Sequence, residues 1–157
     1  MNFKETIHIL QLDQRTIATM ESCTGGGVVN AITNMEGASE VLKFSAVTYS
    51  NEYKIKMGVP KEVIDKYTVY SMETAIEMSK AISSFANSNF GVGITGKLNK
   101  SDPHNPSGDD STVYICIYDR DQNKFYKEKM TVNKESRALN KEDIIDKIIT
   151  MLRAILK

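Results

Sequence analysis

Short apolar segments alternate with helical patterns in the earlier part of this chain, and this alternation is the strongest constraint on its fold. β-Branched and apolar residues predict strands at 16–20, at 46–49 and at 90–95. Two further strands, 112–119 and 124–132, flank a turn and form a predicted hairpin. Strands separated by helices favour parallel pairing, whereas the strands of a hairpin are antiparallel. We therefore predict an α/β fold, a three-layer α/β/α sandwich with a mixed sheet.

Helical periodicity is clearest after Ser71, the predicted N-cap of a helix with apolar residues on one face. The segment 96–111 is rich in Asp, Asn, Pro and Gly and is predicted to be a long loop. Loops of this length are often functional. Other helices are predicted within 1–16, at 28–35, 51–58 and 60–66, and from about Asn140 onward.

Composition narrows the class of protein. The chain has 157 residues, the usual size of one domain, so we predict a single domain over 1–157. Its 20 Lys and Arg balance 20 Asp and Glu, which argues against a nucleic-acid surface and against a polybasic membrane-binding segment. Two cysteines, Cys23 and Cys116, are too few for a disulfide framework. Because no long apolar stretch or signal peptide is seen, we predict a soluble cytoplasmic protein.

The segment ESCTGGG, residues 21–27, joins a predicted strand to a predicted helix. One interpretation is structural: Ser22 or Thr24 caps the helix, and the glycines allow close packing. The other is a binding turn, because amide groups at such a junction suit a phosphate or an oxyanion. The three glycines favour binding, since each weakens a helix by about 1 kcal/mol relative to Ala and a cap needs none.

The segment GVGITG, residues 91–96, matches the dinucleotide-binding pattern G-x-G-x-x-G. Its glycines, however, lie inside a predicted strand, and a polar loop follows where a helix should begin. We therefore interpret these glycines as places where another element packs closely on the sheet.

Familiar nucleophile signatures are absent, because there is no G-x-S-x-G and no serine with a lysine three residues later. His8 lies in the first predicted helix and His104 in the polar loop, so a Ser-His-Asp triad would need His104 to fold back, and two scattered histidines do not predict a metal site. We interpret both as solvated surface residues. In TYSNEYK, residues 48–54, Tyr49 ends a strand and Lys54 lies one turn into the next helix. Lysine deprotonates serine only when desolvation or like charge lowers its pKa by about 3 units from about 10.4. The alternative is that Lys54 is a solvated helix residue.

Taken together, ESCTGGG, EGASEVLKFSAVTYSNEYKIKMGVP (36–60) and GVGITG resemble the CinA carboxy-terminal domain family. The stand-alone members of this family include nicotinamide mononucleotide deamidases. The resemblance extends from about Thr16 to Gly96 and resumes at STVYICIY. It implies a three-layer α/β/α fold, a homodimer, a small-molecule nucleotide as substrate, and an amidase that needs neither metal nor other cofactor.

The serine, tyrosine and lysine of the family fall on Ser22, Tyr49 and Lys54. The resemblance implies that Ser22 attacks the carboxamide carbon of the nicotinamide ring while Lys54 accepts its proton. Tyr49 would relay or steady that proton, and backbone amides from Thr24 to Gly26 would hold the oxyanion or a phosphate. The substrate-binding residues implied by the resemblance are Thr24, Gly25, Gly26, Thr95, Gly96 and Arg137.

The chain departs from the family after Gly96. Members of the family usually continue as T-G-x-x-G-P, whereas this chain reads TGKLNKSDPHNPSGDDSTVY. Asn140 stands where a second arginine is expected, and Arg137 lies nearby. The acidic residues of the loop, partly offset by Lys97 and Lys100, would repel a phosphate; they are Asp102, Asp109 and Asp110. Two alternatives therefore stand beside the deamidase: an amidase for another substrate, and a nucleotide-binding or protein-partner module without this turnover.

Overall fold

The computed structural model describes residues 1–98 and 110–157. Its five-stranded sheet has the order β2-β1-β3-β4-β5. β1 pairs in parallel with both β2 and β3, whereas β4 is antiparallel to β3 and β5 to β4. The predicted mixed sheet is thus confirmed. The strands are β1 (Ile17–Glu21), β2 (Ala46–Val47), β3 (Phe90–Gly96), β4 (Thr112–Asp119) and β5 (Lys124–Thr131).

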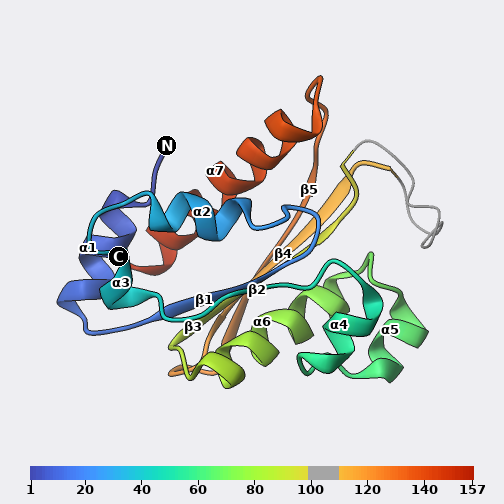
Figure 1. The fold of residues 1–157 in the computed structure, drawn as a ribbon, viewed down its shortest axis with the longest axis horizontal. Coiled ribbons are helices and arrows are strands. Elements are labelled where there is room, and N and C mark those ends of the chain that lie inside the picture. Colours follow the sequence, from blue (N-terminus) through green and yellow to red (C-terminus); the bar gives the residue numbers. More distant parts are fainter. Residues whose placement is uncertain (99–109) are drawn as a thin grey trace.

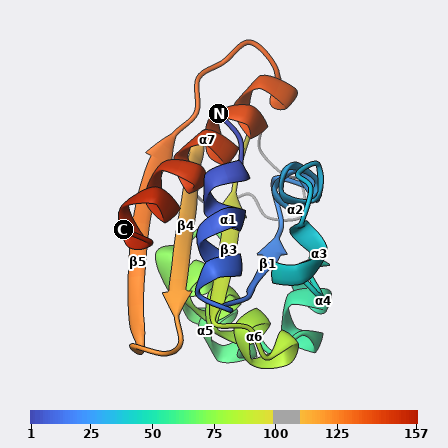
Figure 2. The same ribbon diagram turned by 90° about the vertical axis from the view of Figure 1, so that its left-hand side faces the viewer.

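Helices cover both faces of the sheet, as Figures 1 and 2 show. The larger apolar cluster joins one face to α1, α2, α3 and α7, and the smaller cluster joins the other face to α5 and α6. Ile17 of β1 belongs to the larger cluster and its neighbour Ala18 to the smaller one, as the alternation of side chains along a strand requires. The predicted three-layer sandwich is therefore confirmed. The helices are α1 (Lys4–Leu12), α2 (Gly27–Thr33), α3 (Ala38–Val41), α4 (Asn51–Lys56), α5 (Lys61–Tyr67), α6 (Met72–Ala86) and α7 (Arg137–Ile155).

The glycines of GVGITG let α6 lie directly on β3. A Cβ atom on Gly91 would stand 2.0 Å from the Ser79 carbonyl oxygen, and one on Gly93 would stand 2.3 Å from the Ala75 carbonyl oxygen. No side chain fits at either distance. The prediction that these glycines serve close packing is confirmed.

Helix ends follow the sequence signals in part. Ser71 caps α6, because its Oγ accepts the Thr74 amide, as predicted. α7 begins at Arg137, earlier than predicted, because Ser136 caps it by accepting the Leu139 amide. The short helix α3 was not predicted. The predicted loop falls largely on residues 99–109 and, with His104, lies outside the described residues.

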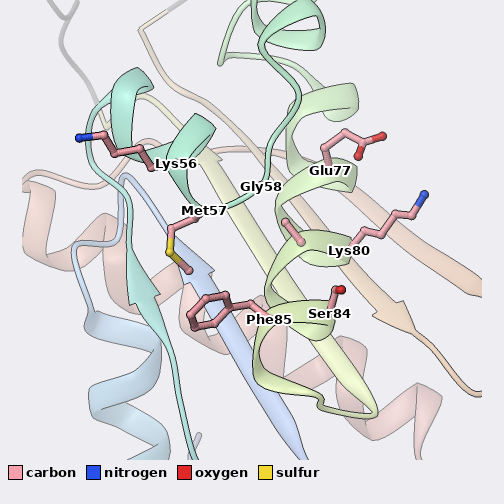
Figure 3. Close-up of a pocket in the computed structure, with 8 residues that line it drawn as sticks. Lys56, Met57, Gly58, Glu77, Lys80, Ser84 and Phe85 are labelled. Carbon is pink, nitrogen blue, oxygen red and sulfur yellow. The ribbon is translucent and has the colours of Figure 1, made fainter.

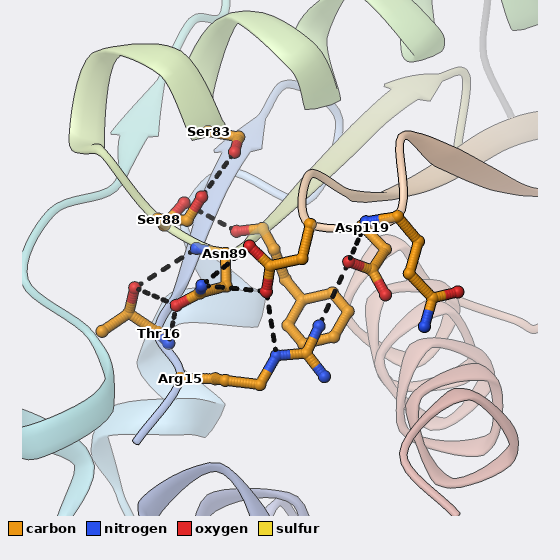
Figure 4. A network of polar contacts seen from close by, with 9 residues as sticks. Arg15, Thr16, Ser83, Ser88, Asn89 and Asp119 are labelled. Carbon is orange, nitrogen blue, oxygen red and sulfur yellow. Dashed lines mark hydrogen bonds and ion pairs between the residues drawn. The ribbon is translucent and has the colours of Figure 1, made fainter. Parts of the chain in front are cut away.

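A polar network ties the chain together where β1 and β3 begin (Figure 4). The Arg15 guanidinium pairs with Asp119 at 3.1 Å and Asp121 at 3.3 Å, and it lies over the Phe90 ring. Asn89 accepts the Thr16 amide at 2.8 Å. These groups satisfy one another, so we assign the network to fixing the start of β1 beside β3.

The opposite edge of the sheet positions the candidate site. β1, β2 and β3 are parallel, so their carboxyl ends meet there. Ser22 follows β1, Thr48 follows β2 and Lys97 follows β3. The chain leaves β1 for α2 on one face and leaves β2 for α4 on the other (Figure 1). Such a reversal opens a crevice between neighbouring strand ends, the usual binding place in open α/β sheets.

Candidate active site

Ser22 is held at the end of β1 by its own backbone. Its amide donates to the Ile94 carbonyl at 3.0 Å, which continues the pairing of β1 with β3. Its carbonyl accepts the Gly25 amide at 2.9 Å and so closes the turn that follows. The residue is buried, with 8% of its surface exposed. The strand and the turn therefore fix the backbone of Ser22.

Lys54 reaches Ser22 from α4. Ser50 caps this helix by accepting the Tyr53 amide, which places Lys54 one turn in. The Lys54 Nζ lies 2.9 Å from the Ser22 Oγ and 2.7 Å from the Thr48 carbonyl oxygen. Only 1% of Lys54 is exposed, and burial favours the uncharged form of an amine. The solvated-lysine alternative is therefore wrong, and two of the predicted residues lie within hydrogen-bonding distance.

The glycine turn has a support that sequence reasoning missed, the buried carboxylate of Glu21. It accepts the Val28 and Val29 amides at 2.9 Å each and the Thr24 hydroxyl at 2.6 Å. Anionic groups stabilise a helix at this end. The first amides of α2 therefore point to Glu21 and not to a ligand. The sequence signal was an acidic residue directly before the turn, whose partners lie seven and eight residues later.

The interpretation in which Ser22 or Thr24 caps α2 is wrong. Gly26 holds the N-cap position with a φ of 98°, and no side chain caps the helix there. The preceding Gly25 has a φ of 60°, so both glycines adopt the left-handed conformation that other residues avoid. Within the described residues, the Thr24 and Gly26 amides donate no backbone hydrogen bond, whereas the Cys23 amide bonds its own thiol. Thr24 and Gly26 are therefore the donors of the turn that a ligand can use.

Cys23 lies beside Ser22 but is poorly suited to be a nucleophile. Burial raises the pKa of its thiol to about 12. Because the thiolate is the reactive form, a thiol with this pKa stays inert near neutral pH. Of the two neighbours, Ser22 is the one with a base in contact.

Tyr49 and Arg137 meet at the rim of the site. The Arg137 guanidinium donates to the Tyr49 hydroxyl at 3.4 Å and to the Leu98 carbonyl at 3.2 Å. It thereby connects the segment after β2 with the segment after β3. Tyr49 is 64% exposed, and among the described residues its hydroxyl contacts neither Ser22 nor Lys54. Its part in a proton relay stays a prediction.

Thr95 and Gly96 hold the end of β3 in place. The Thr95 hydroxyl is buried and donates to the Val69 carbonyl at 2.7 Å. A Cβ atom on Gly96 would stand 2.5 Å from the Thr112 carbonyl oxygen, so glycine lets β4 approach closely. Both residues thus support the strand end, and their predicted contact with substrate stays a prediction.

Positive charge gathers near the carboxyl ends of β1 and β3. Besides Arg137, Lys141 of α7 lies nearby, since its Nζ is 3.4 Å from where a Gly25 side chain would begin. Lys97, directly after β3, is buried, and its Nζ lies 4.5 Å from the centroid of the Tyr70 ring. Within residues 1–98 and 110–157 we find no group of three His, Cys, Asp or Glu side chains arranged to hold a metal.

A groove on the α4–α6 face lies apart from these residues (Figure 3). Met57 and Phe85 point toward each other across it, and the Lys56 and Lys80 amines extend outward. No predicted site residue lines it. We therefore place the candidate site at the strand ends. Of the described helices, none has both the length and the apolar character needed to cross a membrane.

Comparison with known proteins agrees with this architecture. A CinA-like protein of Kosmotoga olearia is 40% identical over 115 residues, covering 71% of this chain but only 27% of that relative. A competence or damage-inducible protein from Enterobacter asburiae has a TM-score of 0.89 at 22% identity, covering 98% of this chain and 95% of that one. A competence-damaged protein (CinA) superfamily protein from Escherichia coli has a TM-score of 0.85 at 21% identity, covering 97% and 87%.

At such identities the two solved structures show the fold alone. The family follows from the sequence itself, because the CinA C-terminal domain description matches residues 3–156, almost the entire chain. This chain, with Ser22 and Lys54 in contact at the ends of its parallel strands, belongs to the CinA C-terminal domain family.

Proposed function

We propose that this chain is an amidohydrolase that converts nicotinamide mononucleotide to nicotinate mononucleotide and ammonia. One observation carries the proposal: the buried Lys54 amine lies 2.9 Å from the Ser22 hydroxyl. A serine needs a base within hydrogen-bonding distance to become a nucleophile. The resemblance of ESCTGGG and VTYSNEYK to the deamidases of the family supplies the substrate.

In the first step, Ser22 attacks the carboxamide carbon while its proton passes to the uncharged Lys54 amine. The Thr48 carbonyl, 2.7 Å from the same nitrogen, accepts a Lys54 hydrogen and leaves the nitrogen lone pair for the serine. The tetrahedral intermediate then collapses, and Lys54 returns the proton to the leaving nitrogen. Ammonia departs, and the nicotinoyl group remains on Ser22 as an ester.

Water completes the cycle. Lys54 takes a proton from the water as it attacks the ester, and Ser22 leaves with a proton returned by Lys54. The product is the carboxylate of nicotinate mononucleotide. During both attacks the carbonyl oxygen carries negative charge, and the amides of Thr24 and Gly26 are the candidate donors to it.

The substrate also carries a phosphate. Arg137 and Lys141 supply positive charge near the glycine turn for that group. Tyr49, beside Arg137, would orient the guanidinium and take part in the proton network.

Release of ammonia from nicotinamide mononucleotide by the purified chain tests the proposal. Turnover should be lost in Ser22→Ala and in Lys54→Met, which keeps side-chain length but has no basic nitrogen. Lys56→Met is the matched control, because Lys56 belongs to the same helix and is exposed; it should retain wild-type turnover.

Absence of turnover in the wild type at high enzyme concentration would overturn the deamidase. Ammonia release would then be measured with nicotinamide riboside, which lacks the phosphate, and with nicotinamide, which lacks both phosphate and ribose. These substrates separate an amidase with another substrate from a binding or partner module. A module should bind nucleotide and release no ammonia from any of them.

A further inference from the structure

Lys97 differs from the other buried lysine of the described residues. Lys54 has two oxygen atoms within 3 Å of its amine, whereas the Lys97 Nζ has no hydrogen-bond partner in the described chain. Only 3% of Lys97 is exposed. Its amine lies over the Tyr70 ring, 4.5 Å from the centroid.

An ammonium group in this state is under-satisfied. It carries three N–H donors, and the face of an aromatic ring replaces only part of the water that burial removes. A buried cation without an acceptor destabilises a fold, and an anion bound beside it would remove that cost. Lys97 is therefore a candidate group for binding an anion.

Its place in the fold indicates where that acceptor lies. Lys97 directly follows β3, and β3 continues its pairing with β1 through the Ser22 amide and the Ile94 carbonyl. The Arg137 guanidinium contacts the next residue, Leu98, through its carbonyl. Lys97 and Ser22 thus both lie at the carboxyl ends of the parallel strands. The second cation at this place is Arg137.

We propose that Lys97 binds the phosphate group of the substrate and is a specificity-determining residue of this chain. The identification of the anion with the substrate phosphate rests on the proposed function; the existence of a phosphate site does not. Arg137, which donates to the carbonyl of the next residue, Leu98, is the candidate second cation of this site. Two cations match the double charge of a phosphate better than the single charge of a carboxylate.

Equilibrium binding in the Ser22→Ala background tests the proposal without turnover. Ribose 5-phosphate and nicotinamide mononucleotide are the phosphate-bearing probes, and ribose and nicotinamide riboside are their phosphate-free counterparts. Lys97→Met should raise Kd at least tenfold for both phosphates and less than twofold for nicotinamide riboside. Lys66→Met is the matched control, because the exposed Lys66 amine also lies over a tyrosine ring, at 5.2 Å; it should change no Kd.

Equal weakening of phosphate-bearing and phosphate-free ligands would overturn the proposal, since it indicates a structural or an oxyanion role. So would an unchanged Kd, or no binding of either phosphate to the Ser22→Ala protein. Thermal unfolding checks the fold: Lys97→Met should raise the Tm of the ligand-free protein, because it removes an unpaired buried charge. Should it fail to fold, Lys97→Gln takes its place in the same measurements.

The two proposals fail separately. Ribose 5-phosphate has no amide, so a phosphate site that depends on Lys97 in a wild type that releases no ammonia would uphold Lys97 and overturn the deamidase. If the wild type releases ammonia from nicotinamide mononucleotide and Lys97→Met leaves KM unchanged, the deamidase is upheld and the role of Lys97 is overturned.

Discussion

The Lys54 amine lies 2.9 Å from the Ser22 hydroxyl oxygen, although 32 residues separate them in the chain. One crossover produces this contact: Ser22 directly follows β1, the chain crosses to β2, the parallel neighbour of β1, and Lys54 reaches back from α4, the helix that follows β2. A lysine in this position can act as a base or as a fixed positive charge. The two roles predict different effects of the same substitution on activity.

Lys54→Arg should abolish amide hydrolysis as completely as Lys54→Met does, a fall in kcat of about 10²-fold or more. Arginine keeps the positive charge but stays protonated at any working pH, so it cannot accept the serine proton. Steady-state ammonia release measures the effect, and Lys56→Arg is the exposed control. Substantial activity in Lys54→Arg would mean that the charge at this position, and not its basicity, serves catalysis.

Glu21→Gln should lower the free energy of unfolding by about 1.5–3 kcal/mol, the range for hydrogen bonds to a charged group. The carboxylate accepts the Val28 and Val29 amides and the Thr24 hydroxyl, and an amide NH₂ would face one of these donors. Urea unfolding measures the change.

Glu40→Gln is the control for this experiment, because Glu40 lies on the short helix α3 and is exposed. It should change stability by less than about 0.5 kcal/mol, as surface substitutions usually do. Equal stability of the Glu21 and Glu40 variants would show that water replaces the carboxylate without loss.

The sequence predicted the architecture and the Ser22–Lys54 pair because both leave local signals. The periodicity of apolar residues indicates strands and helices, and the Ser22 and Lys54 segments resemble known motifs over several consecutive residues. Ser71 was predicted as a cap because its partner, Thr74, lies three residues away.

Features that depend on tertiary neighbours could not be predicted. Thr24 looks like a cap because it precedes a helix, but Glu21 already occupies the amides that a cap would take. Of the strand predicted at 46–49, only Ala46 and Val47 pair in the sheet, at an edge where the strand has one neighbour. The contact between the Lys97 amine and the Tyr70 ring joins two residues that lie far apart in sequence.

Gly93→Ala should destabilise the fold by about 1–3 kcal/mol or more, as overpacking of a core does. Its new Cβ would stand 2.3 Å from the Ala75 carbonyl oxygen, so α6 must move away from the sheet. Gly27→Ala is the matched control, because its nearest neighbour would be Ile145 Cδ1 at 3.6 Å. That variant should be neutral or more stable by about 0.4–1 kcal/mol. Similar urea midpoints for the two variants would contradict the packing assigned to GVGITG.

Alkaline pH should destabilise this protein in part through Cys116. Burial raises the pKa of its thiol from 9.0 to about 11. Above pH 9 the unfolded chain therefore loses the thiol proton while the folded chain keeps it, so the unfolded state binds fewer protons and stability falls as pH rises. The contribution is fully present below pH 9 and is lost between pH 9 and about 11.

Cys116→Ser isolates this effect, because serine does not titrate in this range and can keep the contact with Ser79, whose Oγ lies 3.3 Å from the sulfur. From pH 8 to pH 10, the stability of the wild type relative to Cys116→Ser should fall by about 1.4 kcal/mol. Urea unfolding at each pH provides the measurement, and Cys23 titrates equally in both proteins. Parallel stability curves over this range would mean that the Cys116 thiol titrates alike in the folded and unfolded chains.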